Sequence, residues 1–248
     1  MDIDPMTGRP VKKPTSPWVW VAIGCGGVVV LAIIAFLAFG WMAFRAAKDM
    51  EEGFKDPVKR EQKSKEVIAY QQLPPGYYPA GAIKIPFLLE MAIFSDRELG
   101  AGETPDEHDL GDKGFMFFNM RQMGGNKEDL RRFLRGEEPR EQTWRTNVDY
   151  RPGEVIGMGS VEVKGSPVLY HASRGRVSFG ASASHGEGLV TMLMPDCPGD
   201  KRVRFGFWFT PDEMEGKPVA EADFKGTSAD PEAIKDFLGY FEVCPEKR

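Results

Sequence analysis

The sequence predicts an α+β fold, with an N-terminal transmembrane helix followed by one domain built on a mainly antiparallel sheet with helices packed on it. Three observations carry this prediction. Residues 18–44 form an apolar stretch without a charge, short apolar runs follow in adjacent pairs after residue 77, and amphipathic patterns are few. Paired strands with helices set apart from them are typical of α+β domains.

The chain begins with a polar segment, 1–17, which we expect to be disordered. Residues 18–44 follow and are long enough to cross a bilayer, which needs about 20 apolar residues. Trp18 and Trp20 lie at one end of the stretch and Trp41 at the other. These tryptophans are placed to lie at the two membrane interfaces, so we expect a single-pass anchor in the lipid bilayer.

Three alternatives to a retained anchor are a cleaved signal peptide, a lipoprotein signal at Cys25 and a buried core helix. A signal peptide has a shorter apolar region of about 7–15 residues. Cys25 precedes most of the apolar run, whereas a lipidated cysteine would follow it, so we interpret Cys25 as a free thiol in the membrane. Gly24, Gly26 and Gly27 are small enough for homo-oligomerisation through the span, although they do not form GxxxG.

Residues 45–76 are interpreted as a charged juxtamembrane stalk. Gly53 and Pro57 interrupt a helix that would continue from the membrane. The segment 58–72, "VKREQKSKEVIAYQQ", is rich in helix formers and in charge, which predicts a solvated helix. "LPPGYYP" then marks a turn.

The domain over 77–248 contains several strand patterns. We predict two strands around Pro86 within 80–96, a buried strand within 115–123, a hairpin with its turn near 164–166, and two strands joined at Cys197, "GLVTMLMPD" and "RVRFGFWFTP".

Two helices are predicted in this domain. The first covers 126–136, with Asn126 as N-cap and Gly136 as its end. The second follows the N-cap Asp230, with Pro231 at the first helical position. Its apolar stripe has i, i+3, i+4, i+7 spacing and consists of Ile234, Phe237, Leu238 and Phe241.

This order of elements, from "LPPGYYP" through the helix at 126–136 to the terminal "DPEAIKDFLGYFEVC", resembles the PsbP-like α/β sandwich domains. The likeness covers roughly residues 77–244 and implies a small extracytoplasmic or accessory domain, often without catalysis. The chain is also similar to single-pass membrane-anchored bacterial proteins of unknown function. The resemblance transfers no functional residue to this chain.

Charge excludes one class of partner and leaves the topology open. The chain has 32 Lys and Arg against 37 Asp and Glu, so nucleic-acid binding is not its main role. Basic residues lie on both sides of 18–44, and a long domain can translocate regardless of its flanking charge.

The cysteines give a second indication of topology. Outside the apolar stretch the chain contains only Cys197 and Cys244, each followed by proline at a domain edge. We expect them to form a disulfide, which places the domain in an oxidising compartment outside the cytoplasm. Two unrelated thiols are the alternative.

One catalytic reading rests on the small-residue loop from Gly180 to Gly188, "GASASHGEG". A membrane-tethered hydrolase would use Ser182 or Ser184 with His171 or His185. The loop lacks the G-x-S-x-G spacing of a nucleophile elbow, so we interpret it as a mobile loop and assign no catalytic residue.

Metal and cofactor patterns are weaker still. The acidic loop "TPDEHDLGD", 104–112, includes His108 but lacks the calcium-loop spacing. Met120 with Met123 has MxxM spacing and Met192 with Met194 has MxM spacing, which would suit copper(I). Met116, Met120, Met192 and Met194 lie in apolar strands, however, and are interpreted as core residues. The chain has no GxGxxG or P-loop motif, so no metal or cofactor is assigned.

The expected function is therefore a single-pass membrane-anchored protein whose extracytoplasmic domain binds a protein partner or helps an envelope assembly, without catalysis. The tethered hydrolase is the alternative.

Overall fold

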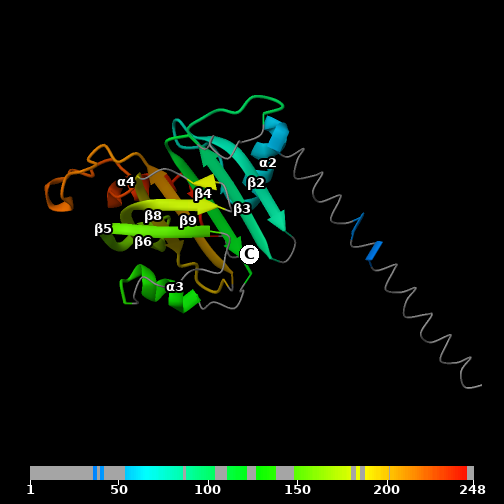
Figure 1. Ribbon diagram of the computed structural model, residues 1–248. Coiled ribbons are helices and arrows are strands. Elements are labelled where there is room, and N and C mark those ends of the chain that lie inside the picture. Colours follow the sequence, from blue (N-terminus) through cyan, green and yellow to red (C-terminus); the bar gives the residue numbers. More distant parts are fainter. Residues whose placement is uncertain are drawn as a thin grey trace, which may run out of the picture. The chain divides into compact units, whose positions relative to one another are not determined.

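The computed structural model (Figure 1) describes residues 36–37, 40–41, 54–85, 88–103, 111–121, 127–137, 148–179, 183–184, 188–200 and 202–244. The chain forms two units, Met1–Asp49 and Met50–Arg248. In the first unit the four described residues are helical, and three of them expose large apolar side chains: Phe36, Leu37 and Trp41. Trp18, Trp20, Cys25 and most of 18–44 lie outside the described residues. Within the described part of the chain, no helix combines the length and apolar character that a membrane span needs.

The second unit is a mixed α+β domain around a large antiparallel sheet, as predicted. Its strand order is β2-β3-β4-β9-β8-β6-β5, and β7 pairs with β6. The strands are β2 (Tyr78–Ile85), β3 (Leu89–Ser95), β4 (Gly114–Met120), β5 (Val148–Val163), β6 (Ser166–Phe179), β7 (Ala183–Ser184), β8 (Gly188–Pro195) and β9 (Val203–Thr210). The β2–β3 pair lies on either side of Pro86, and β8 pairs with β9, both as the sequence predicts.

The few helices cover both faces of this sheet (Figure 1). One face packs against α2 (Pro57–Val67), α4 (Pro231–Leu238) and a ribbon formed by β1 (Ala69–Tyr70) and β10 (Phe241–Glu242). The other face packs against α3 (Lys127–Leu134). A short 3₁₀ helix, η1 (Val219–Glu221), follows β9.

The central strands bury side chains on both faces. Along β9, Trp208 belongs to the core cluster shared with α4, whereas Phe207 and Phe209 belong to the cluster shared with α3. Phe115 and Met116 alternate in the same way along β4. Alternation follows from the two-residue period of a strand, and burial of both faces explains why these strands are almost continuously apolar.

The last helix follows its predicted signals. The Asp230 side chain accepts a hydrogen bond from the Glu232 N–H, and Pro231 is the first helical residue. Phe237 stacks on Trp208, with ring centroids 4.2 Å apart. The helix ends at Leu238, so Phe241 belongs to β10 and not to the helical stripe, although it is still completely buried.

The prediction of a solvated stalk over 45–76 is wrong for the part that contains α2 and β1. Arg60, Ser64 and Val67 are buried on one face of α2, and Tyr70 of β1 lies in the core. The helix packs on β2 and β3. The sequence pattern hid this face because two of its three buried residues are polar.

The predicted hairpin at 164–166 is formed by β5 and β6, whose arms are longer than the pattern indicated. Lys164 and Gly165 occupy the turn with φ of 48° and 74°. Two successive residues with positive φ make the tight turn whose twist matches that of the strands.

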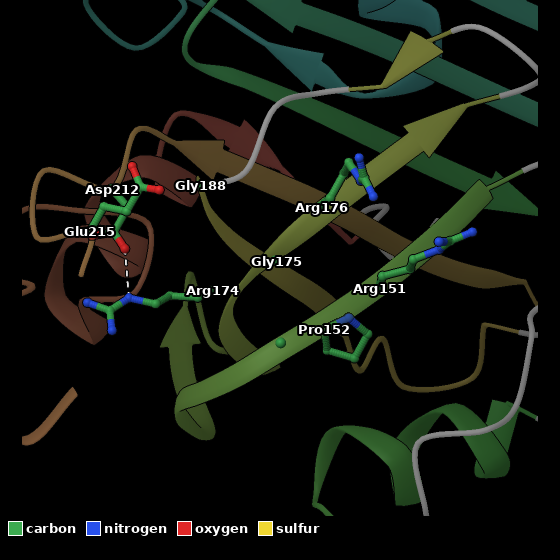
Figure 2. Close-up of a pocket in the computed structure, with 9 residues that line it drawn as sticks. Arg151, Pro152, Arg174, Gly175, Arg176, Gly188, Asp212 and Glu215 are labelled. Atoms are coloured by element: carbon green, nitrogen blue, oxygen red, sulfur yellow. Dashed lines mark hydrogen bonds and ion pairs between the residues drawn. The ribbon is translucent and has the colours of Figure 1, made fainter. Parts of the chain in front are cut away.

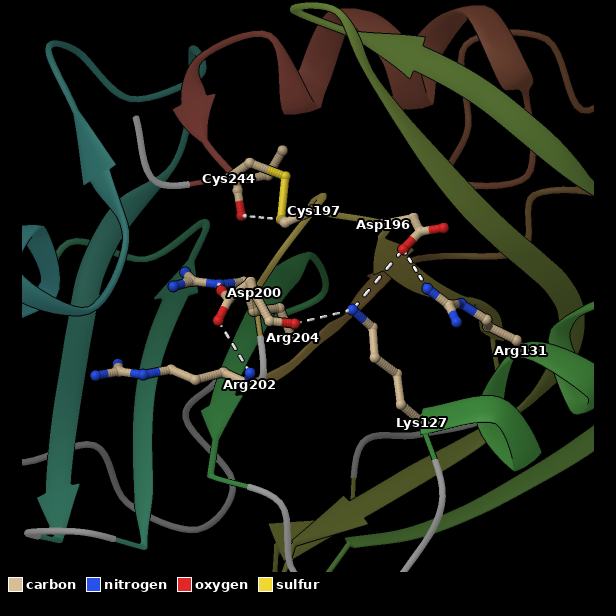
Figure 3. The surroundings of a disulfide bond; sticks show 9 residues. Lys127, Arg131, Asp196, Cys197, Asp200, Arg202, Arg204 and Cys244 are labelled. Carbon is tan, nitrogen blue, oxygen red and sulfur yellow. Dashed lines mark hydrogen bonds and ion pairs between the residues drawn. A yellow bond between two sulfur atoms is a disulfide. The ribbon is translucent and has the colours of Figure 1, made fainter. Parts of the chain in front are cut away.

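The turn between β8 and β9 carries a disulfide and several ion pairs (Figure 3). Cys197 forms a disulfide with Cys244, which follows β10, with the two Cα atoms 5.4 Å apart. Asp196 pairs with Arg131 and Lys127 of α3, and Asp200 accepts a hydrogen bond from Arg204 at 2.8 Å. The disulfide closes 47 residues of chain, worth about 4 kcal/mol if it acts by restricting the unfolded state.

The stacked position of Phe237 generates a stability prediction. Phe237→Ala removes a buried ring that contacts Trp208, Phe115 and Tyr77, so we expect the free energy of unfolding to fall by about 3–5 kcal/mol. Urea denaturation measures this loss. Val58→Ala, on the exposed side of α2, is the control and should change stability by less than about 0.5 kcal/mol. A similar change in both variants would contradict the packing described here.

Candidate functional site

An open hollow with a cavity volume of about 340 Å³ lies where β5 and β6 meet the loop after β9 (Figure 2). We call it the arginine groove. It is lined by Arg151, Pro152, Gly153, Arg174, Gly175, Arg176, Gly188, Asp212 and Glu215.

Glycine forms the floor of the groove because the backbones approach each other closely. A Cβ atom on Gly153 would lie 2.5 Å from the Arg174 carbonyl oxygen, and one on Gly175 would lie 2.5 Å from the Arg151 carbonyl oxygen. The β5–β6 register shifts between Pro152 and Val155, which marks a bulge. Bulges redirect side chains near a strand edge, and this one follows shortly after the Arg151–Arg176 pair.

Arg174 anchors the loop after β9 to the sheet. Its Nε donates to Asp212 Oδ2 at 2.7 Å, and its Nη2 donates to the Met214 carbonyl oxygen at 2.9 Å. Nη1 donates to the Lys217 carbonyl oxygen at 2.5 Å and to Glu154 Oε2 at 3.1 Å. The hydrogen bond to Asp212 raises the pKa of Arg174. This guanidinium is therefore engaged in holding the groove together.

Arg151 and Arg176 lie directly opposite each other on β5 and β6, and both are exposed. Figure 2 shows Arg174 directed toward Asp212, whereas Arg151 and Arg176 project on the other side of Gly175. Like charges at directly opposed positions of an antiparallel pair destabilise the sheet. Both arginines are exposed, so this end of the groove presents positive charge to the solvent.

A second polar cluster lies under α3. The Tyr150 hydroxyl lies 3.2 Å from His171 Nδ1 and 3.0 Å from Ser173 Oγ. His171 and Ser173 are buried, and the Phe133 ring of α3 lies 5.1 Å from the His171 ring. Burial raises the pKa of Tyr150 to about 12, partly offset by the bond to Ser173. The hydroxyl stays protonated and links two strands inside the core.

The serine and histidine candidates of the sequence lie in different places. Ser182 and His185 are outside the described residues, as is His108. Ser184 pairs with Ser178 on β6, seven positions along the strand from His171. Seven residues of strand span about 23 Å, so Ser184 and His171 are not brought together. His171 instead contacts Tyr150, whose hydroxyl also bonds Ser173.

The described methionines that suggested copper lie in or against the core, and the acidic loop is only partly described. Met192 and Met194 are buried in the cluster under α3, and Met120 packs against it, whereas Met123 lies outside the described residues. Among the residues that the structure describes, no group of three or more His, Cys, Asp or Glu is positioned to hold a metal ion. Most of the acidic loop 104–112 is not described.

The arginine groove was missed by sequence reasoning, although a signal existed. "SRGRVS" places Arg174 and Arg176 two residues apart in a strand, so both point to one face. The opposing Arg151 could not be inferred, because the sequence of one strand does not determine its register with the next.

Among known proteins, no family model and no curated sequence matches this chain.

The buried Tyr150 cluster generates a second prediction. Tyr150→Phe removes the hydroxyl that bonds both His171 and Ser173 inside the core, so we expect a loss of about 1–3 kcal/mol in unfolding free energy at neutral pH. Because burial raises the pKa of Tyr150 to about 12, the folded state holds the phenol proton more tightly than the unfolded state does. The resulting contribution to the unfolding free energy is fully present below about pH 10 and disappears as the pH rises toward about 12.

Urea denaturation at pH 7 and between pH 10 and 12 measures both effects. The variant should lose less stability than the wild type across the alkaline range. Tyr78→Phe, at an exposed tyrosine, is the control. Identical alkaline losses in the wild type and Tyr150→Phe would contradict the assignment.

Proposed function

We propose that this chain is a single-pass membrane-anchored protein whose extracytoplasmic domain binds a protein partner without catalysis. The arginine groove is the binding surface, and an acidic segment of an envelope protein is the partner. The observation that carries this proposal is the opposed pair Arg151 and Arg176, two exposed positive charges beside a glycine floor.

The anchor is supported by composition. Residues 18–44 carry no charge and are flanked by Trp18, Trp20 and Trp41, so the lipid bilayer is the first partner of the chain. The large apolar side chains of Phe36, Leu37 and Trp41 are exposed, which suits contact with lipid. Gly24, Gly26 and Gly27 would allow a second copy to pack against the span.

The side of the membrane is supported by the disulfide. Cys197 and Cys244 are bonded, and disulfides persist in oxidising compartments but are rare in the cytosol. Cys197 is 5 % exposed, so the bond lies within the packed domain. An extracytoplasmic location explains a structural disulfide in a domain of this size.

Binding is supported by the electrostatics of the groove. Arg174 is engaged with Asp212 and Glu154, so its charge is largely balanced by the domain itself. Arg151 and Arg176 lie on the solvent side, where arginine favours carboxylate groups of a partner. The interaction is exposed, so salt should weaken it.

The first test concerns location. In intact cells that express the full chain, added protease should digest the domain after residue 44, since the domain is proposed to lie outside the cytoplasm. A thiol reagent should label Cys197 and Cys244 only after reduction, because their sulfurs are bonded. A Cys197→Ser/Cys244→Ser double variant should gain no label on reduction. Digestion only after lysis, or equal labelling with and without reductant, would overturn the proposed location.

The second test concerns the groove. An oligoglutamate peptide should bind the full chain in detergent, and Arg151→Gln/Arg176→Gln should weaken binding about tenfold, because each exposed pair contributes up to about 1 kcal/mol. Lys225→Gln/Lys235→Gln makes the same charge change outside the groove and is the matched control. Fluorescence titration at two salt concentrations measures both. Equal losses in the two double variants would sink the groove as the binding surface.

A further inference from the structure

Arg60 of α2 is a buried arginine with incomplete hydrogen bonding. It is 2 % exposed, and its Nη2 donates to the carbonyl oxygens of Leu99 and, at 3.3 Å, Gly100. Within the described residues, its Nε and Nη1 are buried and have no hydrogen-bond partner. Buried donors in proteins are nearly always satisfied, so an acceptor is missing at this position.

A hollow of about 280 Å³ adjoins Arg60. Tyr70, Tyr78 and Leu73 supply apolar surface to its lining, and Glu98 supplies a carboxylate. The hollow shares no lining residue with the arginine groove. Its volume is just below the range of about 300–1,000 Å³ that is typical of ligand sites, so it suits only a small molecule.

The residues around this hollow carry both signs of charge. Burial lowers the pKa of Arg60, and Glu103, Asp56 and Glu98 offset this only in part. Glu61 is paired with Lys65 at 2.6 Å. Glu98 is exposed and makes no ion pair with another described residue. The site therefore presents a buried positive group and an outer negative group.

We propose that this hollow binds a free α-amino acid with an apolar side chain. The ligand's carboxylate supplies the acceptor that Arg60 lacks, and its ammonium group lies against Glu98. The apolar side chain packs on Tyr70, Tyr78 and Leu73. A zwitterion matches a site that contains both signs of charge, whereas a simple anion would be repelled by Glu98 and a simple cation would be repelled by Arg60.

This inference does not rest on the proposed function, since it uses other residues and another ligand. The test is isothermal titration calorimetry on the full chain in detergent. Three probes share one apolar skeleton: L-leucine, 4-methylpentanoate without the ammonium group, and 3-methylbutylamine without the carboxylate. Leucine should bind tightest, 4-methylpentanoate about tenfold more weakly, and the amine weakest, because charge-assisted hydrogen bonds account for the differences.

Glu98→Gln distinguishes ammonium recognition from general binding. It should weaken leucine binding about tenfold and should not weaken binding of 4-methylpentanoate, because only leucine carries the ammonium group. Glu221→Gln, at an exposed acid outside the hollow, is the matched control and should change neither. Arg60→Lys should weaken both carboxylate probes, with thermal unfolding as the check that this buried variant folds.

Two results would overturn the proposal. One is equal affinity of leucine for the wild type and Glu98→Gln. The other is that no probe gives a heat of binding up to about 10 mM, a concentration at which even weak specific binding is detected. Arg60 would then serve only to hold the backbone at Leu99 and Gly100. If Arg60→Lys fails to fold, the probe series and Glu98→Gln still decide the outcome.

Discussion

The Cys197–Cys244 bond is the constraint on which the arrangement of the domain depends. It joins the β8–β9 turn in the middle of the sheet to the chain that follows β10, a strand of only two residues. The same turn carries Asp196, which pairs with α3 on the other face. This one turn therefore holds elements from both faces of the sheet. The disulfide fixes the segment after β10 on one face, and the Asp196 ion pair fixes α3 on the other.

Burial of the central strands determines where ligands can bind. β4, β8 and β9 are buried along almost their whole length, so both hollows described above lie at the margins of the sheet. The arginine groove lies at the edge hairpin of β5 and β6, and the hollow beside Arg60 lies where α2 meets β2. Each of the two hollows has arginine in its lining, whereas the densely packed Phe and Met side chains of the core leave no such space.

Much of the local structure was predictable. Pro86 between two apolar runs, the Lys164–Gly165 turn and the Asp230 cap are signals carried by neighbouring residues, and each predicts a feature that the structure contains. The α2 segment was mistaken for a solvated stalk, because its buried face contains Arg60 and Ser64. Burial of polar residues depends on partners distant in sequence, here the carbonyl oxygens of Leu99 and Gly100.

By itself, the sequence determined the α+β class and the positions of most strands, because strand periodicity, turn residues and helix caps act over a few residues. The two cysteines outside the apolar stretch also predicted the disulfide that the structure contains. Only the tertiary structure decided that β4 pairs with β9 and β6 with β8, and hence that Arg151 faces Arg176. The physical reason is that strands pair through backbone hydrogen bonds, which are the same for every residue, so register and neighbours follow from the packing of the whole domain.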